Sequence, residues 1–279
     1  MLTNYLGLWP AFVFAWALAM TTGTTSAQTT STTFPTNIEF DLVFPRNETY
    51  AADALLPIVI AIQNPQEVGL LGFSIAWYIY WRGVNASNNY LDSGYQRSLW
   101  ANYSTVGNEP YFETFYTNAL NGTEGQFTLV IDLGTRNCSF VDSNIDSSLH
   151  FGQVSTYGTV DFEMRNGAQL PSLITPKDLC PVGFASFGIT KTIPQSTNEY
   201  MRDTCPVMAD AAPKMNPCAV KINSTVASNI SAGVVASACG AGLLISDCQD
   251  DETNMAAHSG LGSMGWSGVV AGLVLGAAL

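Results

Sequence analysis

The sequence has few charged residues, and this scarcity excludes some classes of function. Only 11% of the 279 residues are charged, against roughly 25% in an average soluble domain. Ten Lys and Arg stand against 22 Asp and Glu, so the formal net charge is −12. Because a protein that binds nucleic acid needs a basic surface, we expect no nucleic-acid partner.

Residues for metal-based or nucleophilic chemistry are also scarce. The chain has two histidines, and neither a C-x-x-C nor a G-x-S-x-G sequence occurs. A zinc site, a Ser-His-Asp triad in a nucleophile elbow, and copper-dependent polysaccharide oxidation from an N-terminal His therefore all lack residues. We expect no metal and no cofactor, and we expect His150 in a loop or at a strand end.

The beginning of the chain is apolar and predicts entry into the secretory pathway. The apolar run Leu6–Met20 is followed by Thr25-Ser26-Ala27, which is typical of a signal peptide cleaved after residue 27. This run is shorter than the roughly 20 apolar residues that a membrane-spanning helix needs. We therefore expect residues 1–27 to be removed.

The other end predicts a lipid anchor. The apolar tail Trp266–Leu279 follows a spacer of small and polar residues, a pattern typical of a GPI-attachment signal. We expect the propeptide to cover residues 255–279, with attachment at Asn254 or, as second choice, Ser259. A secreted protein without an anchor is the alternative.

Sequons for N-glycosylation agree with secretion. Cys138 occupies the middle position of one sequon, so we expect Asn137 to be the least used. The N-x-[ST] sequons are at Asn47, Asn85, Asn102, Asn121, Asn137, Asn223 and Asn229.

An even number of cysteines in an oxidising compartment predicts three disulfides. The six cysteines all lie from residue 138 onward: Cys138, Cys180, Cys205, Cys218, Cys239 and Cys248. Six cysteines allow 15 pairings, which the sequence leaves open. We expect Cys138–Cys180 as a bridge within the first part of the chain.

Short alternating segments predict an antiparallel β-sandwich. Hydrophobic and polar residues alternate from Ile38 to Phe44, and Pro45 ends the segment. Gly, Asn, Asp and Pro separate these segments, and the residues between them, such as 85–92 and 118–125, predict polar loops. The further predicted strands are residues 55–63, 72–81, 126–133, 159–164 and 183–192.

The character of the sequence changes after Pro194. Apolar residues at helical spacing predict one helix over about residues 224–238, with Asn223 or Ser224 as N-cap. We therefore expect a mainly β fold: a sandwich over residues 28–195, and a Cys-rich segment over 196–254 that carries the helix and is stapled to the same domain by disulfides.

Two pairs of carboxylates are candidates for catalysis. Glu39 and Asp41, and likewise Asp161 and Glu163, are two residues apart and so lie on one face of a strand. Paired carboxylates about 5–5.5 Å apart serve retaining glycosidases, but neither pair has a third partner. We expect solvent-facing carboxylates on amphipathic strands, with a glycoside hydrolase or transglycosylase as the alternative.

Aromatic residues offer a second kind of site. In a strand, Trp77 and Trp81 share one face with Ile79, and Tyr78 and Tyr80 share the other. Core packing is the favoured interpretation, whereas an exposed row would form a platform for sugar rings. A second aromatic cluster follows over residues 100–116, and an exposed loop there would bind glycan. The candidate stacking residues are Trp77, Trp81, Trp100 and Tyr111.

The segment Ile38–Tyr50 (IEFDLVFPRNETY), preceded by Phe34-Pro35, resembles the opening of a family of secreted fungal proteins built around a domain of unknown function. Cys205-Pro206 and Asn216–Lys221 (NPCAVK) resemble its closing portion, so the resemblance covers roughly residues 33–248. One departure is Ala52, where the family opening has proline. The resemblance implies a fungal extracellular or wall-associated protein, and it brings no activity or catalytic residue.

Together these patterns predict a secreted, N-glycosylated, GPI-anchored fungal glycoprotein of the cell surface or cell wall. We expect a non-catalytic role, structural or carbohydrate-binding. Its expected partners are wall polysaccharide and, through the anchor, the membrane.

Overall fold

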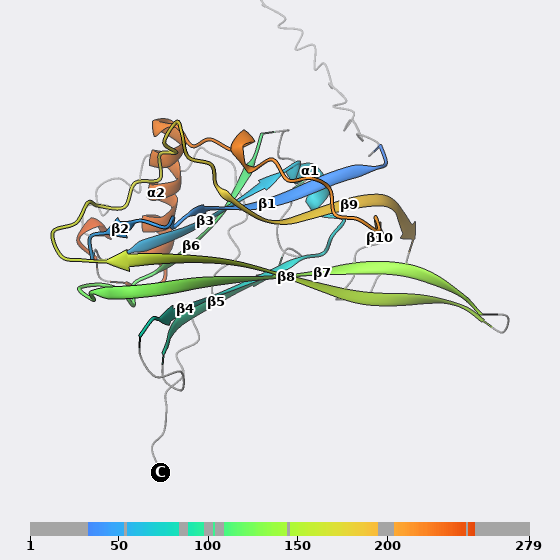
Figure 1. Cartoon of the computed structure of the whole chain (residues 1–279), viewed down its shortest axis with the longest axis horizontal. Helices are drawn as coiled ribbons and strands as arrows, with labels where there is room; N and C mark the ends of the chain where they lie inside the picture. The colour runs from blue at the N-terminus through green and yellow to red at the C-terminus, as the bar shows by residue number, and fades with distance from the viewer. Residues whose placement is uncertain are drawn as a thin grey trace, which may run out of the picture. The chain divides into compact units, whose positions relative to one another are not determined.

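Two five-stranded sheets pack face to face in the computed structural model, within the residues that it describes (Figure 1). These residues are 33–52, 55–83, 89–97, 103, 109–143, 146–194, 204–243 and 245–248. The predicted signal peptide, GPI propeptide and attachment sites Asn254 and Ser259 lie outside them, as do Trp100, Asn85 and Asn102. The β-sandwich predicted from the sequence is confirmed.

Sheet A is antiparallel throughout and has the order β10-β9-β1-β3-β6. Its strands are β10 (Thr204–Met208), β9 (Val182–Pro194), β1 (Thr36–Phe44), β3 (Leu56–Gln63) and β6 (Tyr111–Thr117). The short helix α1 (Pro65–Val68) follows β3.

Sheet B has the order β2-β8-β7-β4-β5 and is mixed, because the short β2 pairs with β8 in parallel. The long strands β7 and β8 form a hairpin that reaches beyond the rest of the sheet (Figure 1). The strands are β2 (Thr49–Tyr50), β8 (Asp146–Met164), β7 (Gly125–Ser143), β4 (Ser74–Trp81) and β5 (Tyr90–Arg97).

Alternation along the strands builds the core between the two sheets. On β1 and β7 every second side chain is apolar and points inward, where it leaves water. Pairs of aromatic rings, such as Phe40 and Phe73 with centroids 5.2 Å apart, fill the middle of this layer. The buried inward residues of these strands are Ile38, Phe40, Leu42, Phe44, Phe127, Leu129, Ile131 and Leu133.

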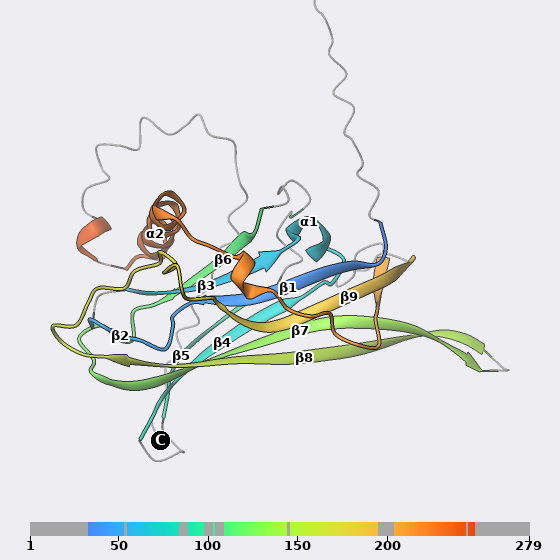
Figure 2. The same ribbon diagram turned by 45° about the horizontal axis from the view of Figure 1, so that its top comes forward.

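The outer face of sheet A is covered by two C-terminal elements. Helix α2 (Ser224–Gly240) lies over β6 on the side away from sheet B (Figure 2). It begins at Asn223, whose Oδ1 accepts the Val226 N–H at 2.9 Å, so the predicted helix and its cap are confirmed. Residues 209–219, which we call the strap, cross β9 and β1 and end in the 3-10 helix η3 (Pro217–Ala219). No helix of the described residues is long and apolar enough to cross a membrane.

Three disulfides are present: two join the C-terminal third to the rest of the sandwich, and the third closes a short loop after α2. They are Cys138–Cys205, Cys180–Cys218 and Cys239–Cys248. All six cysteines are paired, as predicted, but the expected Cys138–Cys180 bridge is wrong. The reason is that β10 lies beside β7, where the Met208 N–H donates to Asn137 Oδ1 at 3.0 Å, and this contact brings Cys205 next to Cys138.

Besides the two-residue β2, three strands were not predicted. Residues 90–92, expected in a polar loop, belong to β5, and the aromatic segment 111–117 is β6. The third, β10, extends sheet A from within the Cys-rich segment. Residues 118–124 do form the expected turn.

Candidate functional site

The predicted stacking residues on β4 point into the sandwich. Trp77 is only 3% exposed, and its indole lies so close to Gly94 on β5 that a Cβ there would overlap it. Trp81 is half-buried against Phe127, with ring centroids 5.5 Å apart. Trp77 therefore belongs to the core and is not available to a sugar ring.

The second aromatic cluster is also part of the packing. Tyr103 and Phe115 are buried, and Tyr111 packs edge-on against Tyr103 with centroids 5.1 Å apart. The expected exposed loop is wrong for residues 111–116, because β6 places them between the core and α2.

The other row of β4 lies on the outer face of sheet B. Tyr78 and Tyr80 alternate with the buried Trp77 and Ile79, so they point away from sheet A. The strand register places three more outward tyrosines around them: Tyr90 and Tyr95 from β5, and Tyr157 from β8. We call Tyr78, Tyr80, Tyr90, Tyr95 and Tyr157 the tyrosine face.

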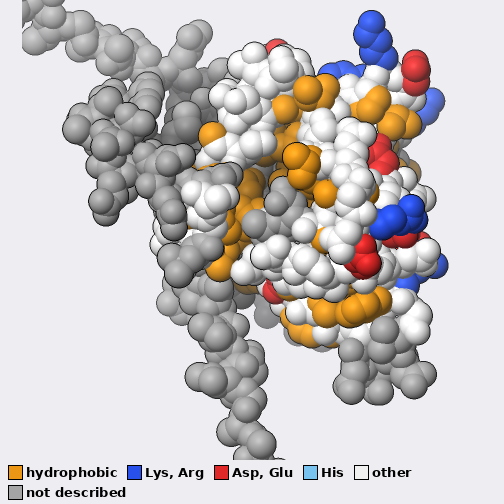
Figure 3. Space-filling view, turned by 90° about the vertical axis from the view of Figure 1, so that its left-hand side faces the viewer, with side chains coloured by type: hydrophobic (Ala, Val, Ile, Leu, Met, Phe, Trp, Pro, Cys, Tyr) orange, Lys and Arg blue, Asp and Glu red, His pale blue; other side chains and the backbone are white. Residues whose placement is uncertain are grey.

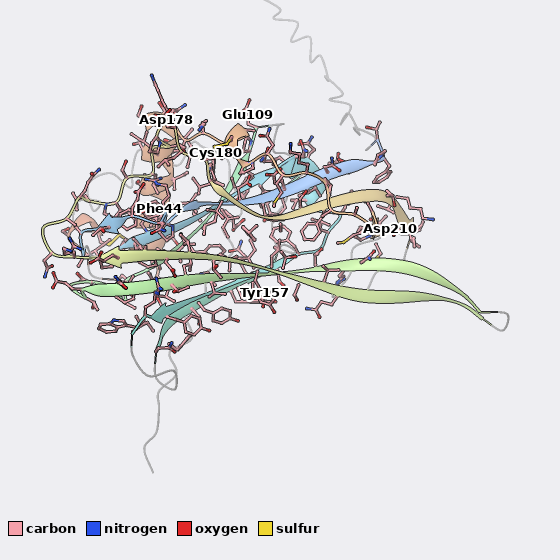
Figure 4. All side chains as sticks on the ribbon, in the orientation of Figure 1. Phe44, Glu109, Tyr157, Asp178, Cys180 and Asp210 are labelled. Atoms are coloured by element: carbon pink, nitrogen blue, oxygen red, sulfur yellow. A yellow bond between two sulfur atoms is a disulfide. The ribbon has the colours of Figure 1, made fainter. Side chains whose placement is uncertain are left out.

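The tyrosine face is open to solvent. Tyr90, Tyr95 and Tyr157 are 52%, 54% and 63% exposed, and Tyr157 lies on the side of sheet B away from sheet A (Figure 4). Three rings follow one another, with centroids 6.5 Å apart from Tyr78 to Tyr80 and 6.0 Å apart from Tyr80 to Tyr90. The Tyr90 hydroxyl donates to Ser93 Oγ. The rings are tilted against one another, by 32° and 65°, and such a row offers apolar ring faces and hydroxyl groups to a ligand.

Two carboxylates lie among these rings. Asp132 on β7 stands directly opposite Tyr157 on β8 and opposite the small Ala76 on β4. Its Oδ1 is shielded from water and accepts no hydrogen bond. Partial burial raises the pKa of Tyr78, and the nearby Asp132 carboxylate raises it further, as do neighbouring tyrosines.

Asp161 is already neutralised by protein groups. It accepts from Thr128 Oγ1 at 2.6 Å and from Arg82 Nη1 at 2.7 Å. The end of the molecule in Figure 3 shows basic and acidic side chains next to one another, in keeping with the ion pairs Arg82–Asp161 and Arg165–Glu163. Asp132 has no such ion pair among the described residues.

The first carboxylate pair is not solvent-facing, which corrects the prediction. Asp41 is 0% and Glu39 8% exposed, because the strap covers them. The Asn216 N–H donates to both Glu39 oxygens, at 2.7 and 2.8 Å, and Gln63 Nε2 donates to Asp41 Oδ2 at 2.8 Å. Burial raises the pKa of Asp41 to about 7, against the Gln63 hydrogen bond, and the Glu39 charge adds to the rise. Asp41, beside Glu39, is therefore protonated in mildly acidic solution and about half protonated near pH 7.

The four predicted carboxylates do not meet in one cleft. Met215 and Asn216 of the strap lie against the buried pair, as the contacts at Gly183 and the Glu39 hydrogen bonds show. Asp161 and Glu163 belong to the other sheet and are partly exposed in their ion pairs, as expected of an amphipathic strand.

A third buried acid was missed by sequence reasoning. Glu113 on β6 points into the sandwich, where it accepts from the Tyr103 hydroxyl at 3.1 Å. Burial raises its pKa to about 7, although hydrogen bonds from Tyr103 and Gln96 oppose the rise. Because Gln96 belongs to β5, this group connects the two sheets at their β5 and β6 edges.

Four of the described sequons lie in turns, between strands or on helix α2. Asn47 follows β1, Asn121 lies in the turn before β7, and Asn223 and Asn229 belong to the start and middle of α2; all four are exposed. Asn137 is half-buried on β7, and its side chain holds the β10 backbone.

His150 lies in a strand, and the described residues offer no metal site. His150 lies within the β8 part of the long hairpin, near its tip, rather than in a loop. No group of three or more His, Cys, Asp or Glu in the described parts of the chain is placed to hold a metal ion.

Comparisons with known proteins add one finding. A family model described as "Domain of unknown function (DUF7136)" matches residues 33–248, which is more than half of the chain. Neither a curated protein nor a solved structure matches.

Proposed function

The chain belongs to the DUF7136 family of a domain of unknown function, and we propose from its own residues that it is a non-catalytic, polysaccharide-binding glycoprotein of the fungal cell surface or wall. The observation that carries this proposal is the tyrosine face: five outward tyrosines from three strands, β4, β5 and β8, of one sheet. Sugar rings present apolar C–H faces and hydroxyl edges, and exposed phenol rings with their own hydroxyls complement both.

The predicted sequence signals support the proposed location. The signal peptide over residues 1–27, the sequons and the paired cysteines fit a secreted glycoprotein, and the C-terminal pattern fits a GPI anchor at Asn254. Glycans at Asn47, Asn121, Asn223 and Asn229 would cover the loops and α2.

A role in hydrolysis is the second candidate, and one observation bears on it. Asp41 is protonated in mildly acidic solution beside Glu39, as the acid of an acid–base pair is, but the strap occupies the space in front of them. We favour the binding role because the tyrosine face is open and this pair is covered.

Co-sedimentation of the secreted protein with insoluble β-glucan, chitin and cellulose tests the proposal. We expect retention on at least one polymer without release of soluble sugars. Replacing the two most accessible ring positions across the face, in the double variant Tyr95→Ala/Tyr157→Ala, should abolish retention. Phe34→Ala, which removes an exposed ring away from the tyrosine face, is the control and should still bind the polymer. Release of sugars, or equal retention of both variants, would contradict the proposal.

A further inference from the structure

Asp132 gives the tyrosine face a carboxylate that forms no ion pair with any of the described residues. One of its carboxylate oxygens accepts no hydrogen bond, and none of the ion pairs of the described residues includes it. A carboxylate that is shielded from water interacts more strongly with a cation than one in bulk solvent. The centre of the face is therefore suited to a positively charged group.

The neighbours of Asp132 favour the same kind of group. Across the sheet, one row reads Tyr95, Ala76, Asp132 and Tyr157. The two small residues in the middle lie between two exposed rings, and Tyr78 is within electrostatic range of both Asp132 and Tyr157. Aromatic rings attract ammonium groups over their faces, so rings and carboxylate act in the same direction.

Competing charges on the face are few. Asp161 is occupied by Arg82, at the end of the row that begins with Tyr80. The outward positions of β4, β7 and β8 next to Asp132 are uncharged, and the nearest outward basic residue along β7 is Arg136, four positions away. The whole protein has a net charge of −12, which attracts a polycation and repels an acidic polysaccharide.

We propose that the tyrosine face recognises a polysaccharide whose sugars carry protonated amino groups, with Asp132 as the carboxylate that contacts them. This rests on the proposed binding role and specifies its ligand class: β-linked glucosamine rather than a neutral glucan or the N-acetylated polymer. The rings stack on the sugars, and the carboxylate selects the ammonium group. A lysine-rich protein would satisfy the charge but not the row of rings.

Calorimetric titration of the secreted full-length product with a glucosamine hexamer and its N-acetylated counterpart tests this inference. At acidic pH and low salt we expect the glucosamine hexamer to bind about tenfold tighter or more. The difference should shrink as salt is added and as the pH rises above the amine pKa.

Asp132→Asn should remove the preference and leave binding of the N-acetylated hexamer unchanged. Asp178→Asn is the matched control, because it removes the same charge from an exposed site on the opposite side of the sandwich (Figure 4). Tyr157→Ala, at the most exposed ring, should weaken both hexamers and serves as a second variant if Asp132→Asn does not fold.

Three results would overturn the inference. Equal affinity for the two hexamers, or an unchanged preference in Asp132→Asn, would mean that the face binds sugars without reading their charge; the proposed function would then stand. Binding of hexalysine as tight as that of the glucosamine hexamer, and insensitive to Tyr157→Ala, would indicate a protein partner. Binding of neither hexamer nor any insoluble polymer would refute the polysaccharide-binding role as well.

Discussion

Replacing Asp41 by Asn should stabilise the protein at neutral and alkaline pH. Asp41 is buried under the strap with its pKa raised from 3.8 to about 7, first by burial and then by the Glu39 charge. Between about pH 4 and pH 7, therefore, Asp41 still carries its proton in the folded state, whereas in the unfolded chain it has already lost it. The free energy of unfolding must then fall as the pH rises from about 4 to about 7.

The size of this loss follows from the shift in pKa. About three pKa units at 1.36 kcal/mol each give an upper limit of about 4 kcal/mol, reached above about pH 7. Asparagine resembles the protonated acid: its carbonyl oxygen can accept the hydrogen bond from Gln63, and its NH2 group can donate toward Glu39. It removes the titration without removing the packing.

Urea unfolding of the wild type and of Asp41→Asn between about pH 4 and pH 8 measures the effect. We expect equal stability at the acidic end and a growing advantage of the variant toward pH 8. The raised pKa of Glu113 also lowers the free energy of unfolding as the pH rises, but it does so equally in both proteins. The difference between the stability curves of the wild type and the variant therefore reports on Asp41 alone. Asp178→Asn, at an exposed position, should follow the wild type. A variant less stable than the wild type at pH 8, or a difference independent of pH, would refute the reasoning.

Three further predictions concern packing, cross-links and modification. Gly94→Ala should cost about 1–3 kcal/mol, because the new methyl group overlaps the Trp77 indole; denaturation followed by tryptophan fluorescence measures this, and an unchanged midpoint contradicts it. Replacing Cys138 and Cys205 together by Ser removes a cross-link that spans 67 residues and should lower the free energy of unfolding by about 4 kcal/mol. Thermal unfolding of the double variant measures this, and an unchanged midpoint contradicts it. Asn137 should carry no glycan, because its side chain binds the β10 backbone. Mass spectrometry of the peptide that contains Asn137 tests this, and a glycan on that peptide would contradict it.

Period-2 alternation made the sandwich predictable where one strand face is apolar and the other is not. The segment from Ile38 to Phe44 shows this pattern and forms β1 as predicted. The pattern fails for β6, because Phe115 faces the core while Phe112 and Tyr116 lie toward α2, so apolar residues occupy both faces. A strand covered on both sides has no alternation to detect.

The candidate site required information that no local pattern contains. The sequence shows that Tyr78 and Tyr80 share a face, but only the order β5-β4-β7-β8 brings Tyr157, nearly 80 residues further along the chain, beside them. The same holds for Glu39 and Asp41. Their alternation with apolar residues predicts exposure, and only the strap, more than 160 residues away, buries them.

The arrangement of the disulfides determines how the molecule would respond to a pulling force applied beyond Cys248. The bridge Cys239–Cys248 holds its short loop closed, and Cys180–Cys218 fastens the strap to the residues before β9. Only residues 219–238, mostly α2, lie between these two bridges, and fully extended they span about 70 Å. After that extension the tension passes through Cys180 into the sandwich, at a point inside the loop that Cys138–Cys205 closes, so this bridge limits how far residues 139–204 can lengthen. Helix α2 thus acts as an extensible tether that takes up the first part of the force.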